Sequence, residues 1–361
     1  MTELAVQPGI MDIDLYVGGK SAIAGRSDVL KLSSNENPLG PPPSAIEAIR
    51  DASAAVHLYP TTDHADLRTA IGEAHALDPD RIVCGVGSDE VLQFATQAFA
   101  GPGDEIIHTA HGFSMYPILA RMAGATPVEV PEIDRVVDVD TILGAVTDRT
   151  RVVLLTNPGN PTGTRLDDAE LIRLAETLPD RILLVIDSAY AEYADGYDGG
   201  AALADRHSNV LMTRTFSKIY GLGGLRIGWG YAARPVIDVL NRIRQPFNLS
   251  ALQMSAAGSA VRDPNWARDC AQLNREQRAR LIGALRQLGL ACDDSETNFV
   301  LARCASEVEA DAAESALLAD GIIVRRVTGY GFPEGLRITV GDTVQTGRVI
   351  ASLTKWREAN Q

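Results

Sequence analysis

Short apolar runs alternate along much of the chain with stretches in which apolar residues recur at helical spacing. The runs show little polar alternation, as is typical of strands covered by helices on both faces. They lie at residues 81–84, 105–108, 126–130, 151–156, 182–187 and 210–213, and helical patterns lie at 90–100, 116–123 and 167–178. We expect Thr164 to cap the last of these helices. The alternation predicts an α/β fold with a mainly parallel sheet, whose ligands gather at the carboxyl ends of the strands.

The pattern changes near Asn265. A long helix is predicted over residues 268–288, followed by short strands at 298–302, 322–325 and 336–340. Residues 1–40 show no core of their own, and the sequence PLGPPP at 38–43 marks a stiff boundary. At 361 residues, one large domain plus a smaller one is expected. We therefore predict a large domain of residues 41–262 and a discontinuous α+β domain of residues 1–40 and 263–361.

Composition narrows the class of protein. Apolar residues make up 45% of the chain and charged residues 22%, as in ordinary globular proteins. The net charge of -14 opposes binding to nucleic acid. No apolar run reaches the roughly 18 residues of a membrane span, and no leader segment is visible. The four cysteines lack paired spacing, which favours free thiols in a reducing compartment, so we expect a cytoplasmic protein.

Lys218 follows one of the predicted strands and precedes a glycine-rich stretch. Ser217 and Thr215 place hydroxyls one and three residues before it, and Arg226 follows eight residues later. These groups could bind a phosphate by charge-assisted hydrogen bonds, which would place the lysine amine beside it as a nucleophile. A surface lysine in a flexible loop is the alternative for this segment alone.

Asp187 ends a wholly apolar run, so we expect it at the carboxyl end of a buried strand. A buried carboxylate is costly unless a cation meets it, and a protonated pyridine nitrogen would be such a cation. A helix cap or a metal ligand is the alternative. No His or carboxylate stands nearby at metal-ligand spacing, so we expect no metal site.

Two further loops follow predicted strands. Residues 157–163, NPGNPTG, could offer an amide to a phenolate oxygen, and by themselves they predict only an elaborate turn. Residues 84–90, CGVGSDE, join a strand to a helix and leave backbone N–H groups free for a phosphate. A dinucleotide fingerprint is the alternative, but Glu90 stands where its third glycine is needed.

Together these segments resemble the fold-type I enzymes that use pyridoxal 5'-phosphate (PLP), and among them the histidinol-phosphate aminotransferase family. The resemblance covers essentially the whole chain. Its matching stretches are KLSSNENP at 31–38, DSAY at 187–190, TFSK at 215–218, GLRIG at 224–228 and LRITVG at 336–341. It implies PLP as the cofactor, a large three-layer α/β/α domain with a mainly parallel sheet, and a smaller α+β domain.

The resemblance also assigns roles around PLP. Lys218 would hold PLP as a Schiff base and then shuttle a proton between the substrate Cα and the cofactor C4′. Asp187 would pair with the ring nitrogen, and Tyr190 with Asn160 would hydrogen-bond the phenolic oxygen. Phe113 would stack on the ring. The phosphate would be held by Ser88, Asp89, Thr215, Ser217 and Arg226.

Further residues are assigned to a partner chain and to the substrate. Tyr59 resembles the tyrosine that family members lend to the neighbouring subunit, which implies a homodimer. Arg337 would bind the α-carboxylate of the amino acid as a fork, unless it is a surface arginine at a strand edge. Tyr16 and Arg325 match positions that hold the phosphate of histidinol phosphate, and Asn37 is expected to contact the substrate.

Three details stay open at the level of sequence. Arg326 follows Arg325, and either could point inward. His111 and Gly112 stand where the family usually has a proline and a threonine, so His111 is either a satisfied loop residue or a substrate contact. Leu15 stands before Tyr16, where a proline is common.

The resemblance implies reversible transamination between histidinol phosphate and 2-oxoglutarate, a step of histidine biosynthesis. An aromatic amino-acid aminotransferase is the nearest alternative, because a pocket for imidazole also accepts a phenyl ring. A decarboxylase of phosphorylated amino acids is another, since fold does not settle the reaction. Outside enzymes, a PLP-binding sensor domain is the alternative, although the chain is acidic and shows no DNA-binding segment.

Overall fold

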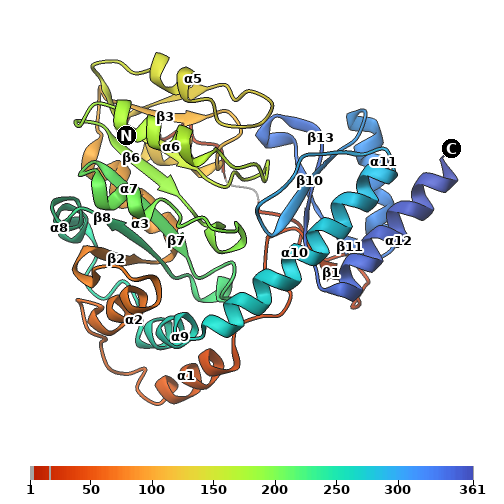
Figure 1. Ribbon diagram of the computed structural model, residues 1–361, viewed down its shortest axis with the longest axis horizontal. Helices are drawn as coiled ribbons and strands as arrows, with labels where there is room; N and C mark the ends of the chain where they lie inside the picture. Colours follow the sequence, from red (N-terminus) through yellow and green to blue (C-terminus); the bar gives the residue numbers. More distant parts are fainter. Residues whose placement is uncertain (1–3, 16–17, 361) are drawn as a thin grey trace.

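A computed structural model describes residues 4–15 and 18–360 of the chain (Figure 1). Its main feature is a seven-stranded sheet, made of β2 (Ile82–Gly85), β3 (Glu105–Thr109), β4 (Thr126–Val130), β5 (Thr150–Thr156), β6 (Leu183–Asp187), β7 (Val210–Thr215) and β8 (Gly228–Ala232). The strand order is β2-β8-β7-β6-β5-β3-β4. Neighbours among β3 to β7 are parallel, whereas β8 is antiparallel to β2 and β7. The predicted mainly parallel sheet is confirmed.

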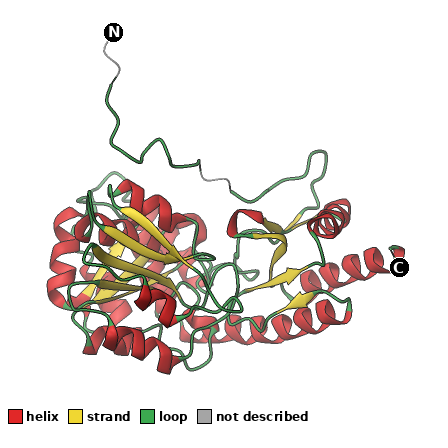
Figure 2. Cartoon of the chain, turned by 90° about the horizontal axis from the view of Figure 1, so that it is seen from above, coloured by secondary structure: helices red, strands yellow, loops and turns green. Residues whose placement is uncertain are grey.

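Helices cover both faces of this sheet (Figure 2). Val152 and Leu154 of β5 share a core with α3, α4 and α8, while Val153 and Leu155 share another with α1, α2, α5, α6, α7 and α9. Burial on both faces explains why the strand sequences lack polar alternation. The helices are α1 (Pro43–Ser53), α2 (Ala65–His75), α3 (Gly87–Phe99), α4 (Met115–Met122), α5 (Val139–Gly144), α6 (Asp168–Thr177), α7 (Ala201–Arg206), α8 (Arg234–Ile243) and α9 (Ala251–Val261).

Two details differ from the sequence-based expectation. The predicted Thr164 cap is wrong: α6 begins at Asp168 with Asp167 at its N-cap position, and the Thr164 hydroxyl donates to the Arg135 carbonyl at 2.6 Å. Strand β8 was not expected, because its sequence GWGYA contains two glycines, which weaken a strand signal.

A smaller layer lies beside the large sheet. The helix α10 (Pro264–Gln287) runs between the two, and four antiparallel strands follow in the order β12-β13-β10-β9 (Figure 1). We call residues 291–359 the C-terminal unit. It contains β9 (Ala291–Cys292), β10 (Phe299–Arg303), α11 (Glu307–Ala319), β11 (Ile322–Ile323), β12 (Arg325–Val327), β13 (Phe332–Thr339) and α12 (Thr343–Ala359).

The C-terminal unit has a hydrophobic core of its own, which includes Leu281 and Leu285 of α10. The N-terminal segment joins it, because β1 (Leu30–Lys31) pairs in parallel with β11. Short 3-10 turns complete the described elements: η1 (Pro79–Arg81), η2 (Ala191–Tyr193), η3 (Gly223–Leu225) and η4 (Thr328–Tyr330). The domain boundaries near residues 40 and 262 stay a prediction.

Within residues 4–15 and 18–360, no helix combines the length and apolar character needed to cross a membrane.

Candidate active site

The ends of several strands meet at one edge of the large sheet. Parallel strands β5, β6 and β7 end there with Thr156, Asp187 and Thr215. Strand β8 runs the opposite way, so Arg226, two residues before its start, reaches the same edge. These ends border a cavity of about 190 Å³, lined by Gly19, Ser33, Ser34, Asn35, Ser88, Asp89, Phe113, Thr156, Asn160, Asp187, Ala189, Tyr190, Thr215, Ser217, Lys218, Arg226, Arg325, Tyr330 and Arg337.

Asp187 presents a buried carboxylate at the base of the cavity, and its exposed fraction is 4%. Thr213 Oγ1 donates to Oδ1 at 3.2 Å, and Tyr116 Oη donates to Oδ2 at 3.1 Å. Burial, followed by the negative charge of Asp89, raises the pKa of Asp187 to about 6, although both donors act in the opposite direction. A carboxylate held in this way favours a cationic partner.

Lys218 is half-buried, and its Nζ lies 5.7 Å from the centre of the Tyr190 ring. Withdrawal from water, and next the charge of Arg337, lower the pKa of Lys218 to about 8. More of this amine is therefore neutral near pH 7 than for an ordinary lysine, which suits a nucleophile or a base.

The amino end of α3 borders the cavity through Ser88 and Asp89. The first turn of this helix, with Ser88 and Asp89, has backbone N–H groups that lack helical acceptors. Arg226 lies across it, with Nη1 3.2 Å from Ser217 Oγ and Nη2 2.9 Å from Asp89 Oδ2. A Cβ at Gly228 would lie 2.1 Å from the Ser88 nitrogen, so only glycine permits this approach of β8 to α3.

Arg337 enters the cavity from the C-terminal unit. Its neighbours Leu336 and Ile338 belong to the core of that unit, so Arg337 points to the opposite face of β13. Its Nη1 donates to Asn160 Oδ1 at 2.6 Å, and its Nη2 donates to the Ser33 carbonyl at 3.0 Å. The guanidinium thereby joins the C-terminal unit to the loop after β5.

Strand register decides between Arg325 and Arg326. Arg325 lies directly opposite Arg337 in the antiparallel pair of β12 and β13, so both side chains share one face. Arg326 lies opposite Leu336, and its guanidinium contacts Asp311 and the Pro333 carbonyl. Arg325 is therefore the residue that lines the cavity.

Two aromatic side chains complete the wall. The Tyr190 hydroxyl accepts a hydrogen bond from Asn35 Nδ2 at 2.9 Å, and burial raises the pKa of Tyr190 to about 12. Phe113 lies edge-on to Tyr116, with ring centres 5.9 Å apart. Asn35 has a positive φ of 55°, and its backbone N–H donates to Thr339 Oγ1 at 3.0 Å, which fixes the N-terminal segment at the cavity.

Two expected site residues, Tyr59 and Asn37, are not brought to the cavity. Tyr59 is 83% exposed and stacks on Phe247, with ring centres 4.6 Å apart. The amide of Asn37 donates to the Ile219 carbonyl at 2.7 Å, so it supports the loop that follows Lys218. Tyr16 lies outside the described residues.

Several lining residues were not found from the sequence: Gly19, Ser33, Ser34, Asn35, Thr156, Ala189 and Tyr330. Ser33, Ser34 and Asn35 belong to the stretch KLSSNENP, whose resemblance was the available signal. Tyr116, which holds Asp187, gave no signal because an apolar helix face explains a tyrosine equally well.

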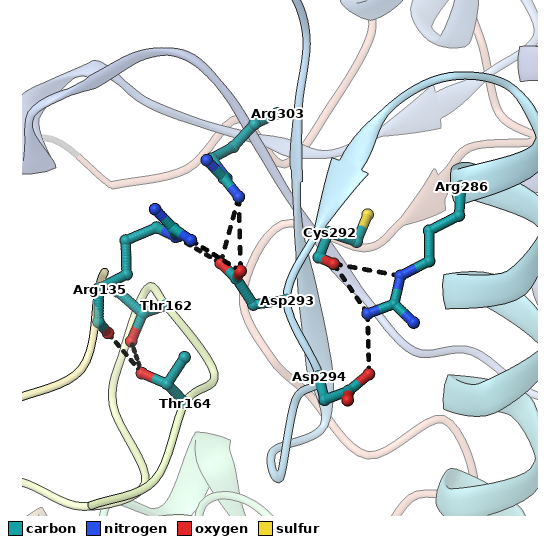
Figure 3. Close-up of polar contacts among 8 residues, drawn as sticks. All are labelled: Arg135, Thr162, Thr164, Arg286, Cys292, Asp293, Asp294 and Arg303. Atoms are coloured by element: carbon teal, nitrogen blue, oxygen red, sulfur yellow. Dashed lines mark hydrogen bonds and ion pairs between the residues drawn. The ribbon is translucent and has the colours of Figure 1, made fainter. Parts of the chain in front are cut away.

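A second polar contact joins the two parts of the structure outside the cavity (Figure 3). Arg135 donates to both carboxylate oxygens of Asp293, at 2.5 and 2.9 Å, and Arg303 approaches the same carboxylate at 3.4 Å. The backbone carbonyl of Arg135 accepts from Thr164, which also contacts Thr162. This chain of contacts links the C-terminal unit to the loop that carries Asn160.

The donor set fits PLP. An anion site at a helix start suits a phosphate, a buried carboxylate with a raised pKa suits a pyridinium nitrogen, and an amine of lowered pKa suits an aldehyde. In the part of the chain that the structure describes, no group of three or more His, Cys, Asp or Glu side chains is placed to hold a metal ion.

Comparison with known proteins identifies the family of this chain. The family model described as aminotransferase class I and II matches residues 27–353. The chain is 62% identical to histidinol-phosphate aminotransferase of Ruegeria pomeroyi, over 99% of each chain. It is 60% identical to the enzyme of the same name from a Jannaschia species, over 96% of this chain and 97% of the other.

A solved structure extends the comparison to three dimensions. Histidinol-phosphate aminotransferase from Sinorhizobium meliloti, determined in complex with pyridoxal-5'-phosphate, superposes with a TM-score of 0.90. Both chains are covered fully, at 27% identity.

Proposed function

This chain belongs to the aminotransferase class I and II family, among the histidinol-phosphate aminotransferases, and we propose that it transaminates L-histidinol phosphate with 2-oxoglutarate. The products are imidazole-acetol phosphate and L-glutamate, and the reaction belongs to histidine biosynthesis. The observation that carries this proposal is the pair Arg325 and Arg337, which face one cavity opposite Lys218 and Asp187. The relatives do not favour the alternative of an aromatic amino-acid aminotransferase.

PLP is the cofactor, and the cavity offers a group for each part of it. Bound PLP supplies an electron-withdrawing ring that stabilises negative charge at the Cα of the amino acid. Asp187 keeps the ring nitrogen protonated, because its burial and its two donors hold a carboxylate in place there. Asn160 and Tyr190 are positioned for the phenolic oxygen, and Phe113 for the ring face.

The phosphate of PLP would be held at the start of α3. The backbone N–H groups of Ser88 and Asp89 and the hydroxyls of Thr215 and Ser217 supply neutral donors, and Arg226 supplies charge. Anchoring the phosphate at this point would leave Asp187 and Phe113 as groups available to the ring.

Lys218 then acts as the base. Its amine, with a pKa lowered to about 8, can take the proton from the substrate Cα and deliver it to the C4′ position of the cofactor. Arg337 orients the Cα by binding the α-carboxylate of glutamate as a fork. Lys218 and Arg337 approach from different parts of the structure, so substrate binding requires both parts to be correctly placed.

Arg325 supplies the group that distinguishes substrates. Histidinol phosphate carries a phosphate and no α-carboxylate, so a second guanidinium beside Arg337 suits it. Tyr16 and Asn37 were also expected near the substrate. Asn37 would instead act indirectly, because its amide donates to the Ile219 carbonyl and so supports the loop after Lys218.

Replacing Arg325 with Ala should lower kcat/KM for histidinol phosphate by about 100-fold, because a charge-assisted contact to phosphate is lost. The loss with phenylalanine, which lacks phosphate, should stay below about threefold. Steady-state kinetics with both substrates measures this difference. Arg326→Ala is the matched control, since that side chain contacts Asp311 and should leave the ratio between the substrates unchanged. Equal losses on both substrates in Arg325→Ala would remove the phosphate role.

The smaller domain, residues 1–40 and 263–361, would cap the cavity. It brings Arg325 and Arg337, whereas the groups proposed for PLP lie in residues 41–262. The four cysteines are buried free thiols, which supports a reducing compartment such as the cytoplasm.

We further propose a homodimer in which Tyr59 completes the neighbouring site. Tyr59 lies on the surface with the exposed apolar side chains Val56, Leu58 and Phe247, a patch that a second copy of the chain would cover. Because Tyr59 does not line the cavity of its own chain, its hydroxyl is available to the partner's cofactor phosphate.

Tyr59→Phe should weaken PLP binding by about tenfold, since only a hydrogen bond is removed. Fluorescence titration of the apo-protein gives this affinity, and sedimentation of the wild type should give twice the chain mass of 38.6 kDa. A monomeric wild type, or a Tyr59→Phe variant with unchanged PLP affinity, would contradict the shared site. His57→Ala, a change on the same surface loop, is the control.

A further inference from the structure

The segment that carries Phe113 is joined to the C-terminal unit by His111 and Ser114. His111 Nδ1 lies 2.7 Å from the Tyr330 carbonyl oxygen. Since a carbonyl only accepts, the imidazole must carry the proton on Nδ1 and donate it. Ser114 Oγ lies 3.0 Å from the Tyr330 hydroxyl. Tyr330 is thus held at its backbone and at the end of its side chain by residues on both sides of Phe113.

Packing reinforces these hydrogen bonds. The His111 ring lies against Phe332, with ring centres 4.2 Å apart and planes inclined by 33°. Gly331, between the two contacted residues, has a φ of +81°, and a Cβ there would lie 3.2 Å from His111 Cε1. Tyr330 and Phe332 also form a small apolar cluster with Leu301 and Val327, apart from the main cores. The loop of residues 328–332 is therefore shaped to receive the imidazole.

Glu132 supports His111 from the large-sheet side. It lines a small cavity together with Thr109, His111 and Gly112. Burial raises the pKa of Glu132, while the Thr109 hydroxyl and both the charge and the backbone of His111 lower it. Glu132 therefore interacts with the backbone of His111 and places a carboxyl group near its ring.

The contact joins two segments that each contribute a residue to the lining of the cavity. Phe113 is in the wall proposed for PLP, and Tyr330 comes from the same unit as Arg325 and Arg337. His111 itself is absent from the lining residues. The hydrogen bond from His111 therefore fixes the spacing between Phe113 and the unit that carries Arg325 and Arg337.

We propose that His111 is a positioning residue for the amino-acid substrate: it anchors the Tyr330 loop to the Phe113 segment and so keeps Tyr330 in the substrate side of the cavity. This proposal rests on the proposed aminotransferase function. Of the two alternatives for His111, the proposal favours a loop residue with satisfied hydrogen bonds over a direct substrate contact. It also gives the Tyr330 loop a role in substrate binding.

The test compares His111→Leu, which removes the donor, with His111→Asn, whose amide nitrogen can stand near the Nδ1 position. His111→Leu should raise KM for histidinol phosphate about tenfold, with kcat within about threefold of the wild type and PLP affinity unchanged. His111→Asn should recover most of the KM. Hydrogen exchange of residues 328–332 should be faster in His111→Leu and return towards the wild-type rate in His111→Asn.

Loss of kcat with unchanged KM, equal defects in both variants, or unchanged exchange in the loop would each overturn the proposal. If His111→Leu does not fold, Tyr330→Phe and Ser114→Ala test the second hydrogen bond, and both should raise KM without changing PLP affinity. Unchanged KM in both would also overturn it. An inactive wild type would refute the proposed function alone, since the exchange rates test the anchor without turnover.

Discussion

Lys218→Ala is expected to lower turnover by about 10⁴-fold or more, equivalent to about 5 kcal/mol in the barrier, because the cavity then loses its base and its amine nucleophile. The protein should also lose the visible absorption that PLP shows when it is bonded to a lysine amine. Steady-state kinetics and absorption spectra of the purified variant measure these two effects.

Lys355→Ala, a change at an exposed lysine in α12, is the matched control and should behave as the wild type. Borohydride reduction of the wild type, followed by peptide mass mapping, should place the cofactor on the peptide that contains Lys218. Wild-type turnover in Lys218→Ala, or a modified peptide elsewhere in the chain, would refute the assignment of this lysine.

Asp187→Asn should lower kcat/KM by about 10³-fold, or about 4 kcal/mol, because a neutral amide cannot hold the ring nitrogen of PLP protonated. Tyr116→Phe is the control: it keeps the carboxylate and removes one of its donors, so a loss near tenfold is expected. Parallel kinetics with saturating PLP measures both. Similar losses in the two variants would mean that the charge of Asp187 is not what matters.

In the absence of PLP, Asp187→Asn should be at least as stable as the wild type. The pKa of Asp187 is raised from 3.8 to about 6, so the folded apo-protein binds its proton more tightly than the unfolded chain does. The stability contributed by this proton is complete below pH 3.8 and is lost as pH rises through about 6. Apo Asp187→Asn should therefore unfold at a higher temperature than the wild type above pH 6, and this difference should shrink towards pH 4. A constant difference across this range would contradict the raised pKa.

The large sheet could be predicted because its strands are apolar on both faces. Runs such as 182–187 and 151–156 match β6 and β5 closely. Asp187 ends β6 and Lys218 follows the end of β7, as expected from the rule that ligands gather at strand ends. Strand β8 was missed because its two glycines weaken the local strand signal. The cap of α6 was mispredicted because the Thr164 hydroxyl bonds to the distant Arg135 carbonyl.

Residues of the cavity that come from distant segments required the structure. The choice of Arg325 over Arg326 depends on register with β13, which no local pattern specifies. Tyr330 joins the cavity through a turn at Gly331, and its contact with His111 spans 219 positions of the chain. Asn35 was hidden in a loop with no periodicity, and only the resemblance of its segment pointed to it.

The central claim is that the cavity converts histidinol phosphate, and substrate preference tests it most directly. The purified, PLP-loaded protein should be assayed with histidinol phosphate, phenylalanine and tyrosine, each with 2-oxoglutarate as the acceptor. We predict a kcat/KM for histidinol phosphate at least about 100-fold above those of the aromatic amino acids, because only this substrate offers a phosphate to Arg325. Equal or greater kcat/KM with phenylalanine or tyrosine would contradict the claim and assign the enzyme to aromatic amino-acid metabolism.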